Sequence, residues 1–383
     1  MKIAVIGGGP AGLFFAIITK KRQPQWQITV HEQNAQGATF GFGVVVADTG
    51  LARLREADAE SHDALVACML QTDRQTIAQA GMPIDLVQPK PGRGAIARLQ
   101  LLQVLQGIAQ RLGVSLRYGE RVSNFEALDA DLVIGADGVN SALRAQSEQA
   151  FGTTRRLLSN HFAWFGTTRV FANPALIFRK HLGGHFVAHY YPYCDSMSTF
   201  VAECDDATWQ RLHLGEATDT QRQSLVEAVF APELQGHALI ANNNTLNTIW
   251  RQFPVIRNAQ WHAGKQVLIG DALSSAHFSI GSGTRIAMED AAALAHAVLT
   301  HPDSVPAALA AFVAERKPHK DRLIEASEKS FDWYEAMAQH MDRLSPHAFV
   351  HSYMTRTGRV DDARLAAMFP AFMAERSTML LNK

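Results

Sequence analysis

Cysteine is scarce in this chain, which argues against a protein held together by disulfide bonds. The 383 residues include three cysteines, Cys68, Cys194 and Cys204, whose spacing fits neither a disulfide framework nor a metal site. The sequence therefore predicts a reducing compartment, which we take to be the cytoplasm, and no bound metal ion.

Charge of one sign and long apolar runs are also lacking. Lysine plus arginine and aspartate plus glutamate each total 36, which leaves a formal net charge of zero. A neutral chain has no broad basic field to attract nucleic acid or an anionic membrane. No uninterrupted apolar stretch is long enough to cross a bilayer, and the apolar start is too short for a secretory signal. We therefore expect neither nucleic-acid nor membrane partners.

What the sequence does contain begins with a glycine-rich turn near the N-terminus. Residues 2–6 form a short apolar run that predicts a buried parallel strand. Gly7, Gly9 and Gly12 follow with the Gly-x-Gly-x-x-Gly spacing, and an apolar helix comes next. A second predicted strand ends at Glu32, 20 residues after Gly12, where this arrangement places an acid on a ribose. The combination predicts an ADP-binding site, and a tight turn without a ligand is the alternative.

A second glycine-rich segment, residues 270–291, indicates contact with an anionic cofactor. An apolar strand over 266–269 ends in Gly270-Asp271, which sets a carboxylate at a sheet edge. The turn Gly281-Ser282-Gly283 then opens an alanine-rich helix, whose free amide groups favour an anion.

An arginine at the start of a predicted helix gives a further indication. Arg98 opens an amphipathic helix, where a positive charge is unfavourable beside the helix dipole. That position makes sense if Arg98 faces a phosphate, and a surface arginine is the alternative.

The pattern of residue types changes between about residues 160 and 255. Alternating and aromatic-rich runs there predict antiparallel strands of a second domain, with one helix over about 218–230. Residues 49–80 predict helices, and the chain is largely helical from about 305.

Three motifs in this order resemble those of the single-component FAD-dependent aromatic hydroxylases, the p-hydroxybenzoate hydroxylase-like flavoprotein monooxygenases. They are the glycines at 7–12, Asp137-Gly138 and Gly270-Asp271, and the resemblance spans nearly the whole chain. It implies an α/β fold with a discontinuous, Rossmann-like FAD-binding domain, a β-sheet substrate domain and C-terminal helices. The expected boundaries are 1–80, 95–158 and 262–320 for the FAD domain, 81–94 and 159–261 for the substrate domain, and 321–383 for the helical region.

The same resemblance implies a role for each motif residue on the adenosine side of FAD. Gly7, Gly9 and Gly12 would admit the pyrophosphate, and Glu32 would hold the adenosine ribose. Arg98 would lie near the phosphates or the ribitol chain.

On the flavin side, the resemblance implies that Asp271 contacts the ribitol. Asp137 and Gly138 belong to a motif associated with both FAD and NADPH. Backbone amides near the pyrimidine edge of the flavin would come from one turn, at Gly281, Gly283 and Thr284.

Three residues are candidates for the group that accepts a proton or a hydrogen bond from the substrate ring. His277 is the first because it lies beside the predicted flavin turn, and a packed or orienting histidine is its alternative. His189 and Tyr191 lie on a predicted inward-facing strand, where a core role is the common alternative.

The implied activity is NAD(P)H- and O2-dependent hydroxylation of an electron-rich aromatic ring through a flavin C4a-hydroperoxide. Segments 41–45, 277–284 and 354–359 are similar to the branch that contains salicyloyl-CoA 5-hydroxylase and anthraniloyl-CoA monooxygenase, and the violacein-pathway hydroxylase of a tryptophan derivative shares much of this likeness. An aryl-CoA thioester is therefore the expected substrate, with a free indole or aminoaromatic compound as the alternative. A flavin-binding protein without oxygenase activity is the remaining alternative. Either NADPH or NADH, and either a monomer or a homodimer, fits the sequence.

Overall fold

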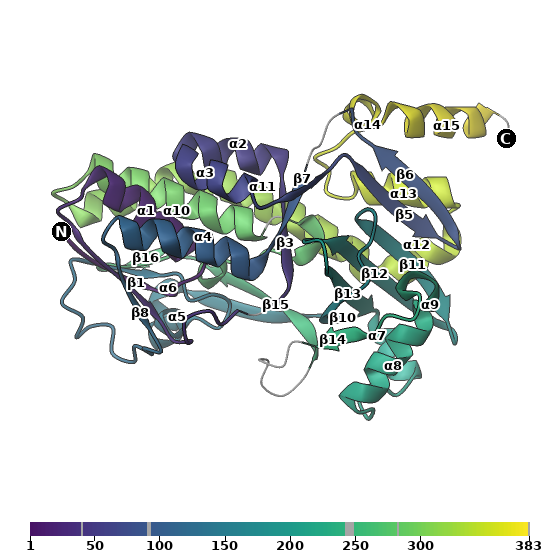
Figure 1. Ribbon diagram of the computed structural model, residues 1–383, viewed down its shortest axis with the longest axis horizontal. Helices are drawn as coiled ribbons and strands as arrows, with labels where there is room; N and C mark the ends of the chain where they lie inside the picture. Colours follow the sequence, from purple (N-terminus) through teal and green to yellow (C-terminus); the bar gives the residue numbers. More distant parts are fainter. Residues whose placement is uncertain (40, 90–92, 242–248, 282, 382–383) are drawn as a thin grey trace.

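The computed structural model describes residues 1–39, 41–89, 93–241, 249–281 and 283–381 (Figure 1). Within this described part, the strands form three sheets. The first is a six-stranded sheet in the order β16-β17-β9-β1-β2-β8. Its members are β1 (Lys2–Ile6), β2 (Gln27–Glu32), β8 (Ser115–Tyr118), β9 (Leu132–Gly135), β16 (His262–Ala263) and β17 (Gln266–Leu268).

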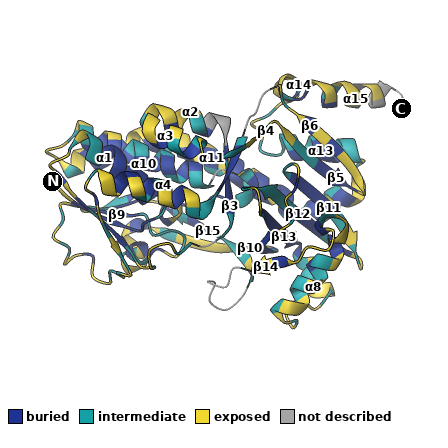
Figure 2. Cartoon of the chain, in the orientation of Figure 1, coloured by how far each residue is buried: buried dark blue, intermediate teal, exposed yellow. Residues whose placement is uncertain are grey.

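All strands of this sheet run parallel except β16, which is antiparallel to β17. Helices α1, α4 and α10 lie together on one side of it (Figure 1). Strand β9 is buried throughout and α1 is buried from Ala11 to Thr19, because both lie between other layers and carry continuous apolar runs (Figure 2). The helices around this sheet are α1 (Pro10–Arg22), α4 (Arg98–Arg111), α5 (Ala142–Gln146), α6 (Glu148–Phe151), α10 (Gly283–Thr300) and the first part of α11 (Val305–Glu335).

The second sheet has eight strands and lies in the other half of the molecule. One face packs with Phe165, Phe186 and Phe200 against the apolar side of α8, where Phe230 follows. The opposite face packs with Phe178 against the end of α11 and the helices that follow it. The strands are β5 (Arg74–Gln79), β6 (Met82–Val87), β10 (Thr153–Thr167), β11 (Ala175–His181), β12 (Gly184–Pro192), β13 (Ser198–Cys204), β14 (Leu239–Ala241) and β15 (Trp250–Asn258). The helices are α7 (Asp206–Arg211), α8 (Asp219–Val229), α9 (Ala231–Leu234), α12 (Met337–Arg343), α13 (Pro346–Thr355), α14 (Asp362–Met368) and α15 (Pro370–Leu381).

A small third sheet joins the two halves. It consists of β3 (Gly43–Ala47), β4 (Leu70–Thr72) and β7 (Arg93–Ala97), with helices α2 (Asp48–Ala57) and α3 (Ala59–Val66) between β3 and β4. The expectation of helices over 49–80 is correct as far as α3 and wrong beyond it, because β4 and β5 occupy the last part. β5 pairs with β11, about a hundred residues further along the chain, and that partner is invisible in the local pattern. The expected domain boundaries stay predictions.

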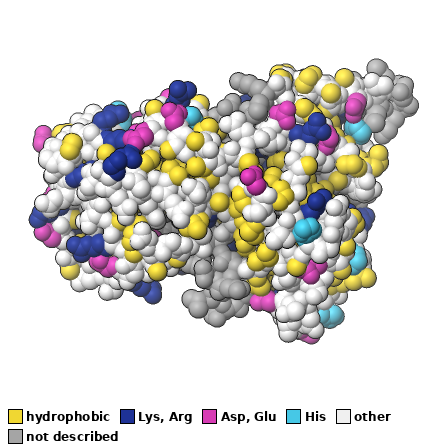
Figure 3. All heavy atoms as spheres, in the orientation of Figure 1, with side chains coloured by type: hydrophobic (Ala, Val, Ile, Leu, Met, Phe, Trp, Pro, Cys, Tyr) yellow, Lys and Arg dark blue, Asp and Glu magenta, His cyan; other side chains and the backbone are white. Residues whose placement is uncertain are grey.

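The surface and helices agree with the composition. Basic and acidic side chains are interspersed over the face drawn in Figure 3 and do not gather by sign. Among the described residues, no helix is both long and apolar enough to cross a membrane.

Candidate active site

The strand order of the parallel sheet gathers the predicted cofactor residues at one edge. Strands β17, β9, β1 and β2 are neighbours, and each is followed or ended by one predicted site residue. Parallel strands share one carboxyl edge, where open α/β sheets bind their ligands. Asp271, Asp137, Gly7 and Glu32 therefore lie in a row across this edge, in the order of their strands.

The turn between β1 and α1 requires its glycines for different reasons. Gly7 has φ +107°, and a side chain there would overlap the Ala136 carbonyl group from the neighbouring turn. A side chain at Gly12 would overlap the Gly7 carbonyl. Gly9 is different, because a Cβ atom there would meet nothing within 4 Å. Gly7 and Gly12 thus hold the turn close to the sheet, while Gly9 leaves open space at the start of α1.

The amino end of α1 is arranged for an anion. Gly9 caps this helix without a side-chain hydrogen bond, and Pro10 follows. Free backbone amides at a helix start attract negative charge. Glu32 lies beside this turn, where its Oε2 accepts a hydrogen bond from Gly8 N at 2.8 Å. Its Oε1 accepts from both nitrogens of Asn34, so the carboxylate is held in place with acceptor capacity left.

The turn after β9 places Asp137 and Gly138 beside the first turn. Asp137 Oδ2 accepts hydrogen bonds from Ala142 N at 2.7 Å and Leu143 N at 3.3 Å, while its buried Oδ1 has no partner among the described residues. Gly138 has φ +77° and open space where a side chain would be. The fully buried Arg144 ties this turn to the next one, since its Nη1 donates to Ala272 O at 2.8 Å.

Asp271 follows β17 at the carboxyl edge of the parallel sheet. Its side chain is accessible to solvent, yet the surrounding protein raises its pKa above the ordinary value, against the opposing effect of Lys320 and Arg98. Its accessible surface leaves this carboxylate free to accept hydrogen bonds from a ligand. Burial lowers the pKa of Arg98, and its buried Nε has no partner among the described residues. Behind the turn, Gly270 N donates to Asp290 Oδ2 at 3.0 Å, and Asp290 is paired with Lys320.

The start of α10 offers a second set of free backbone amides. Gly281 has φ +57° at the end of the short helix η2 (Phe278–Ile280), and α10 begins at Gly283 with Thr284 next. Side chains at either glycine would meet nothing within 4 Å, so this helix start also faces open space. The third member of the predicted turn, Ser282, lies outside the described residues.

His277 is buried and its ring is already engaged. It caps η2, where Nδ1 accepts from Ser279 N at 3.3 Å and lies 2.7 Å from Ser279 Oγ. Burial, together with His189 and Arg356, lowers the pKa of His277 to about 3. The imidazole is therefore neutral at pH 7 and holds the η2 turn together.

His189 and Tyr191 share the inward face of β12 but differ in their contacts. His189 Nε2 lies 3.5 Å from Glu203 Oε2, and Asn160 holds the other oxygen of this carboxylate at 2.9 Å. Tyr191 donates to Gly43 O at 2.8 Å, and burial raises its pKa well above the ordinary value. Tyr191 thus fastens the large sheet to β3, whereas His189 lies beside a buried carboxylate.

An aromatic group joins these residues to the η2 turn. Phe278 contacts the Phe162 ring at a centroid distance of 4.8 Å and the His189 ring at 5.6 Å. Tyr334 of α11 stacks on His189 at 5.4 Å. The structure thus brings His277 and His189 to one aromatic wall. Glu203 and Arg144 were not predicted from the sequence, because each contacts partners that are far away in the chain.

The residues at this edge of the parallel sheet fit FAD. Two helix starts with open space offer amides, Arg98 offers an unpartnered guanidinium nitrogen, and Asp137 and Asp271 offer carboxylate oxygens. A dinucleotide with a pyrophosphate and two sugar chains requires this set of donors and acceptors.

Comparison with known proteins gives a family match. The family model described as FAD binding domain matches residues 109–327. Salicyloyl-CoA 5-hydroxylase of a Streptomyces species is 35% identical, over 93% of this chain and 70% of its own length. A 3-hydroxy-4-methyl-anthranilyl-[aryl-carrier protein] 5-monooxygenase of Streptosporangium sibiricum is 33% identical, over 96% and 97%. Protodeoxyviolaceinate monooxygenase of Chromobacterium violaceum is 34% identical, over 93% and 94%.

A solved structure shares the fold. The tetrameric form of 2-methyl-3-hydroxypyridine-5-carboxylic acid oxygenase superposes with a TM-score of 0.71 at 20% identity, covering 94% of this chain and 98% of that one. This similarity confirms the predicted α/β fold with a Rossmann-like FAD-binding domain.

Proposed function

The chain belongs to the FAD-dependent aromatic monooxygenases, as its motifs predicted, and from this premise we propose that it hydroxylates an electron-rich aromatic acid held as a CoA thioester. NAD(P)H would be the reductant and O2 the oxidant. The observation that carries the proposal is the row of Asp271, Asp137, Gly7 and Glu32 along one sheet edge, beside an aromatic wall. We further propose the cytoplasm as its location.

Each predicted cofactor residue has a task in this proposal. The open start of α1 at Gly9 would hold the pyrophosphate, with Arg98 supplying a positive charge. Glu32 would accept the ribose hydroxyls and Asp271 those of the ribitol. The start of α10 at Gly283 would stabilise negative charge on the ring system through its amides. Bound FAD would supply the redox chemistry, namely hydride acceptance and O2 activation.

The large sheet would hold the substrate ring and exclude water. Phe162, Phe253 and Phe278 pack together beside the predicted flavin turn, with His189 at their border. A dry pocket protects a reactive oxygen species from discharge into water. These aromatic side chains support an aromatic substrate because rings stack favourably on one another.

His189 is the proton acceptor that the geometry favours. A ring hydroxyl or amino group reacts faster when a neighbouring base takes its proton. The Glu203 carboxylate beside His189 would stabilise the imidazolium that forms. His277, the first candidate from the sequence, would have a positioning role, because Nδ1 already accepts a hydrogen bond. Tyr191 would position β3 through Gly43.

Two relatives favour a thioester, because their names specify acyl groups on CoA or on an aryl-carrier protein. The relative that acts on protodeoxyviolaceinate favours the alternative, a tryptophan-derived substrate. A screen with the FAD-loaded protein separates them. NADPH oxidation would be measured with salicyloyl-CoA, anthraniloyl-CoA, the free acids and tryptophan derivatives, and hydroxylated product would be scored instead of peroxide. Product from a thioester supports the proposal, whereas product from free compounds alone overturns it.

A further inference from the structure

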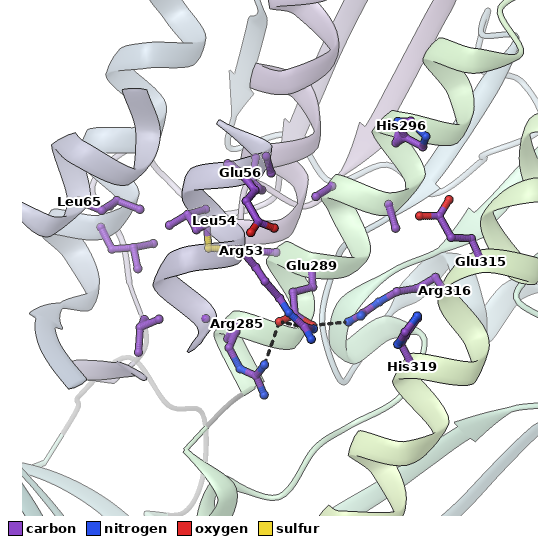
Figure 4. Close-up of a pocket in the computed structure, with 18 of the residues that line it drawn as sticks. Arg53, Leu54, Glu56, Leu65, Arg285, Glu289, His296, Glu315, Arg316 and His319 are labelled. Atoms are coloured by element: carbon purple, nitrogen blue, oxygen red, sulfur yellow. Dashed lines mark hydrogen bonds and ion pairs between the residues drawn. The ribbon is translucent and has the colours of Figure 1, made fainter. Parts of the chain in front are cut away.

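A cavity lies apart from the predicted FAD-binding residues. It has a volume of about 580 Å³ and lies between α2 and α3 on one side and α10 and α11 on the other (Figure 4). None of the predicted FAD-binding residues lines it. Ligand sites in proteins commonly have about 300–1,000 Å³, so this cavity is large enough for a nucleoside.

One end of the cavity is crowded with arginines. Figure 4 shows Arg53, Arg285 and Arg316 extending toward Glu289 from three different helices. The ion-pair distances to the Glu289 carboxylate are 3.3 Å for Arg53, 2.8 Å for Arg285 and 3.0 Å for Arg316. Arg316 is also satisfied by Asp290, but Arg53 is half exposed and one glutamate serves all three guanidinium groups.

Two further observations make this end suitable for binding an anion. Arg285 is 8% exposed, and its buried Nε has no hydrogen-bond partner among the described residues. The exposed Arg359, which follows α13, does not line the cavity but lies close enough to Arg285 and Arg53 for their charges to act on it. Burial and the neighbouring guanidinium groups, Arg285 and Arg53 among them, lower the pKa of Arg359, while Glu289 opposes this shift. Like charges gathered in this way repel one another unless an anion joins them.

The rest of the cavity suits the organic part of a nucleotide. Its floor is apolar, with Phe14, Leu54 and Met288 among the lining side chains. Glu56 and Glu315 line it too, and their carboxylates are suitable acceptors for amino and hydroxyl groups. The attraction for phosphate is thus confined to the arginine end.

We propose that this cavity binds a phosphorylated adenosine diphosphate group, with its phosphates on Arg53, Arg285 and Arg359. CoA thioesters and NADPH both carry such a group, so the inference rests on the proposed function and names its second site. Three basic residues of the large sheet and its helices are already committed. Arg179 is paired with Glu233, Lys180 with Asp342, and Arg356 binds the Ser279 carbonyl oxygen.

The test compares binding of two probes, CoA and NADP⁺, to the FAD-loaded protein by titration calorimetry. The variants are Arg53→Gln, Arg359→Gln and their combination, which change side chains at the surface and leave the buried Arg285 intact. Arg121→Gln is the matched control, since Arg121 is an exposed arginine outside the cavity. Each single change should weaken one probe about five- to tenfold, because a charged hydrogen bond to phosphate is lost from a partly exposed site. Bound FAD per protein should stay constant.

The probe that loses affinity identifies the source of the phosphates. A loss for CoA assigns the cavity to the substrate, and a loss for NADP⁺ assigns it to the reductant. Affinities that stay within twofold of the Arg121→Gln control for both probes would overturn the proposal. That result is distinguishable from failure of the proposed function, because binding is measured without turnover and the wild-type product screen is scored separately.

Discussion

The guanidinium of Arg144 donates a hydrogen bond to the backbone oxygen of Ala272 at 2.8 Å, and so joins the turn after β9 to the turn after β17. A second bond from Arg144 Nη2 reaches Val139 O at 2.5 Å. One buried side chain thus sets the spacing of two turns, which carry Asp137 and Asp271 at the carboxyl edge of the parallel sheet.

Replacing this side chain should weaken both stability and cofactor retention. Arg144→Met would remove one donor from each of two carbonyl groups, of which Ala272 O would keep only the bond from Asn258 Nδ2. The expected cost is about 2–4 kcal/mol in the free energy of unfolding. Urea unfolding and the FAD content after gel filtration measure the two effects. Arg155→Met is the control, because Arg155 forms an exposed ion pair with Glu148 and should cost about 1 kcal/mol or less. Equal costs for both changes would contradict this role.

Asp271 should be needed for FAD affinity more than for folding. Asp271→Asn keeps the size of the side chain and removes a charged hydrogen-bond acceptor from the turn after β17. This change should weaken FAD binding about tenfold or more. Fluorescence titration of the apoprotein with FAD measures this change. Asp129→Asn, at an exposed aspartate paired with Lys2, is the matched control. An unchanged FAD affinity for Asp271→Asn would refute the assignment.

His277 should make stability depend on pH in the acid range. The pKa of His277 falls from 6.5 to about 3 on folding. Between these two pH values the imidazole is protonated in the unfolded chain and neutral in the folded protein. The stabilisation is complete above pH 6.5 and is lost by about 1.4 kcal/mol per pH unit as pH falls toward 3. Urea unfolding of the wild type and His277→Gln between pH 7 and 4 tests this, and the gap between them should narrow with falling pH. A constant gap would contradict the burial of a neutral imidazole.

His189 and Glu203 should act on hydroxylation and leave FAD binding intact. His189→Asn should lower the rate of hydroxylated product about 100-fold, the usual contribution of a general base. Glu203→Gln should lower it less and should shift the pH profile of the rate, because the imidazolium loses its anionic partner. His185→Asn, on the same strand but beside Asp342, is the control. A wild-type product rate in His189→Asn would return the role of base to His277.

Local parts of the fold were predictable from the sequence because their signals lie within a few residues. The strand at residues 2–6, its glycine turn and the position of Glu32 follow from apolar runs and spacing. The start of α4 at Arg98 was likewise visible, since helix periodicity begins there.

Contacts between distant segments were not predictable. β5 has an ambiguous local pattern and is a strand between β6 and β11, the second of which is about a hundred residues away in the chain. Glu203 belongs to no sequence motif. Its proposed role depends on the pairing register of β12 and β13, which brings it near His189. Arg53, Arg285 and Arg316 come from three separate helices, so their convergence on Glu289 is a property of the folded chain.

The source of the new oxygen atom tests the central claim most directly. The FAD-loaded protein would be given NADPH, an aryl-CoA thioester and O2 enriched in heavy oxygen, and the product would be analysed by mass spectrometry. The account predicts one labelled oxygen atom on the aromatic ring for each substrate molecule converted. NADPH oxidation that yields peroxide alone across the aromatic substrates, or a ring oxygen that comes from water, would contradict it.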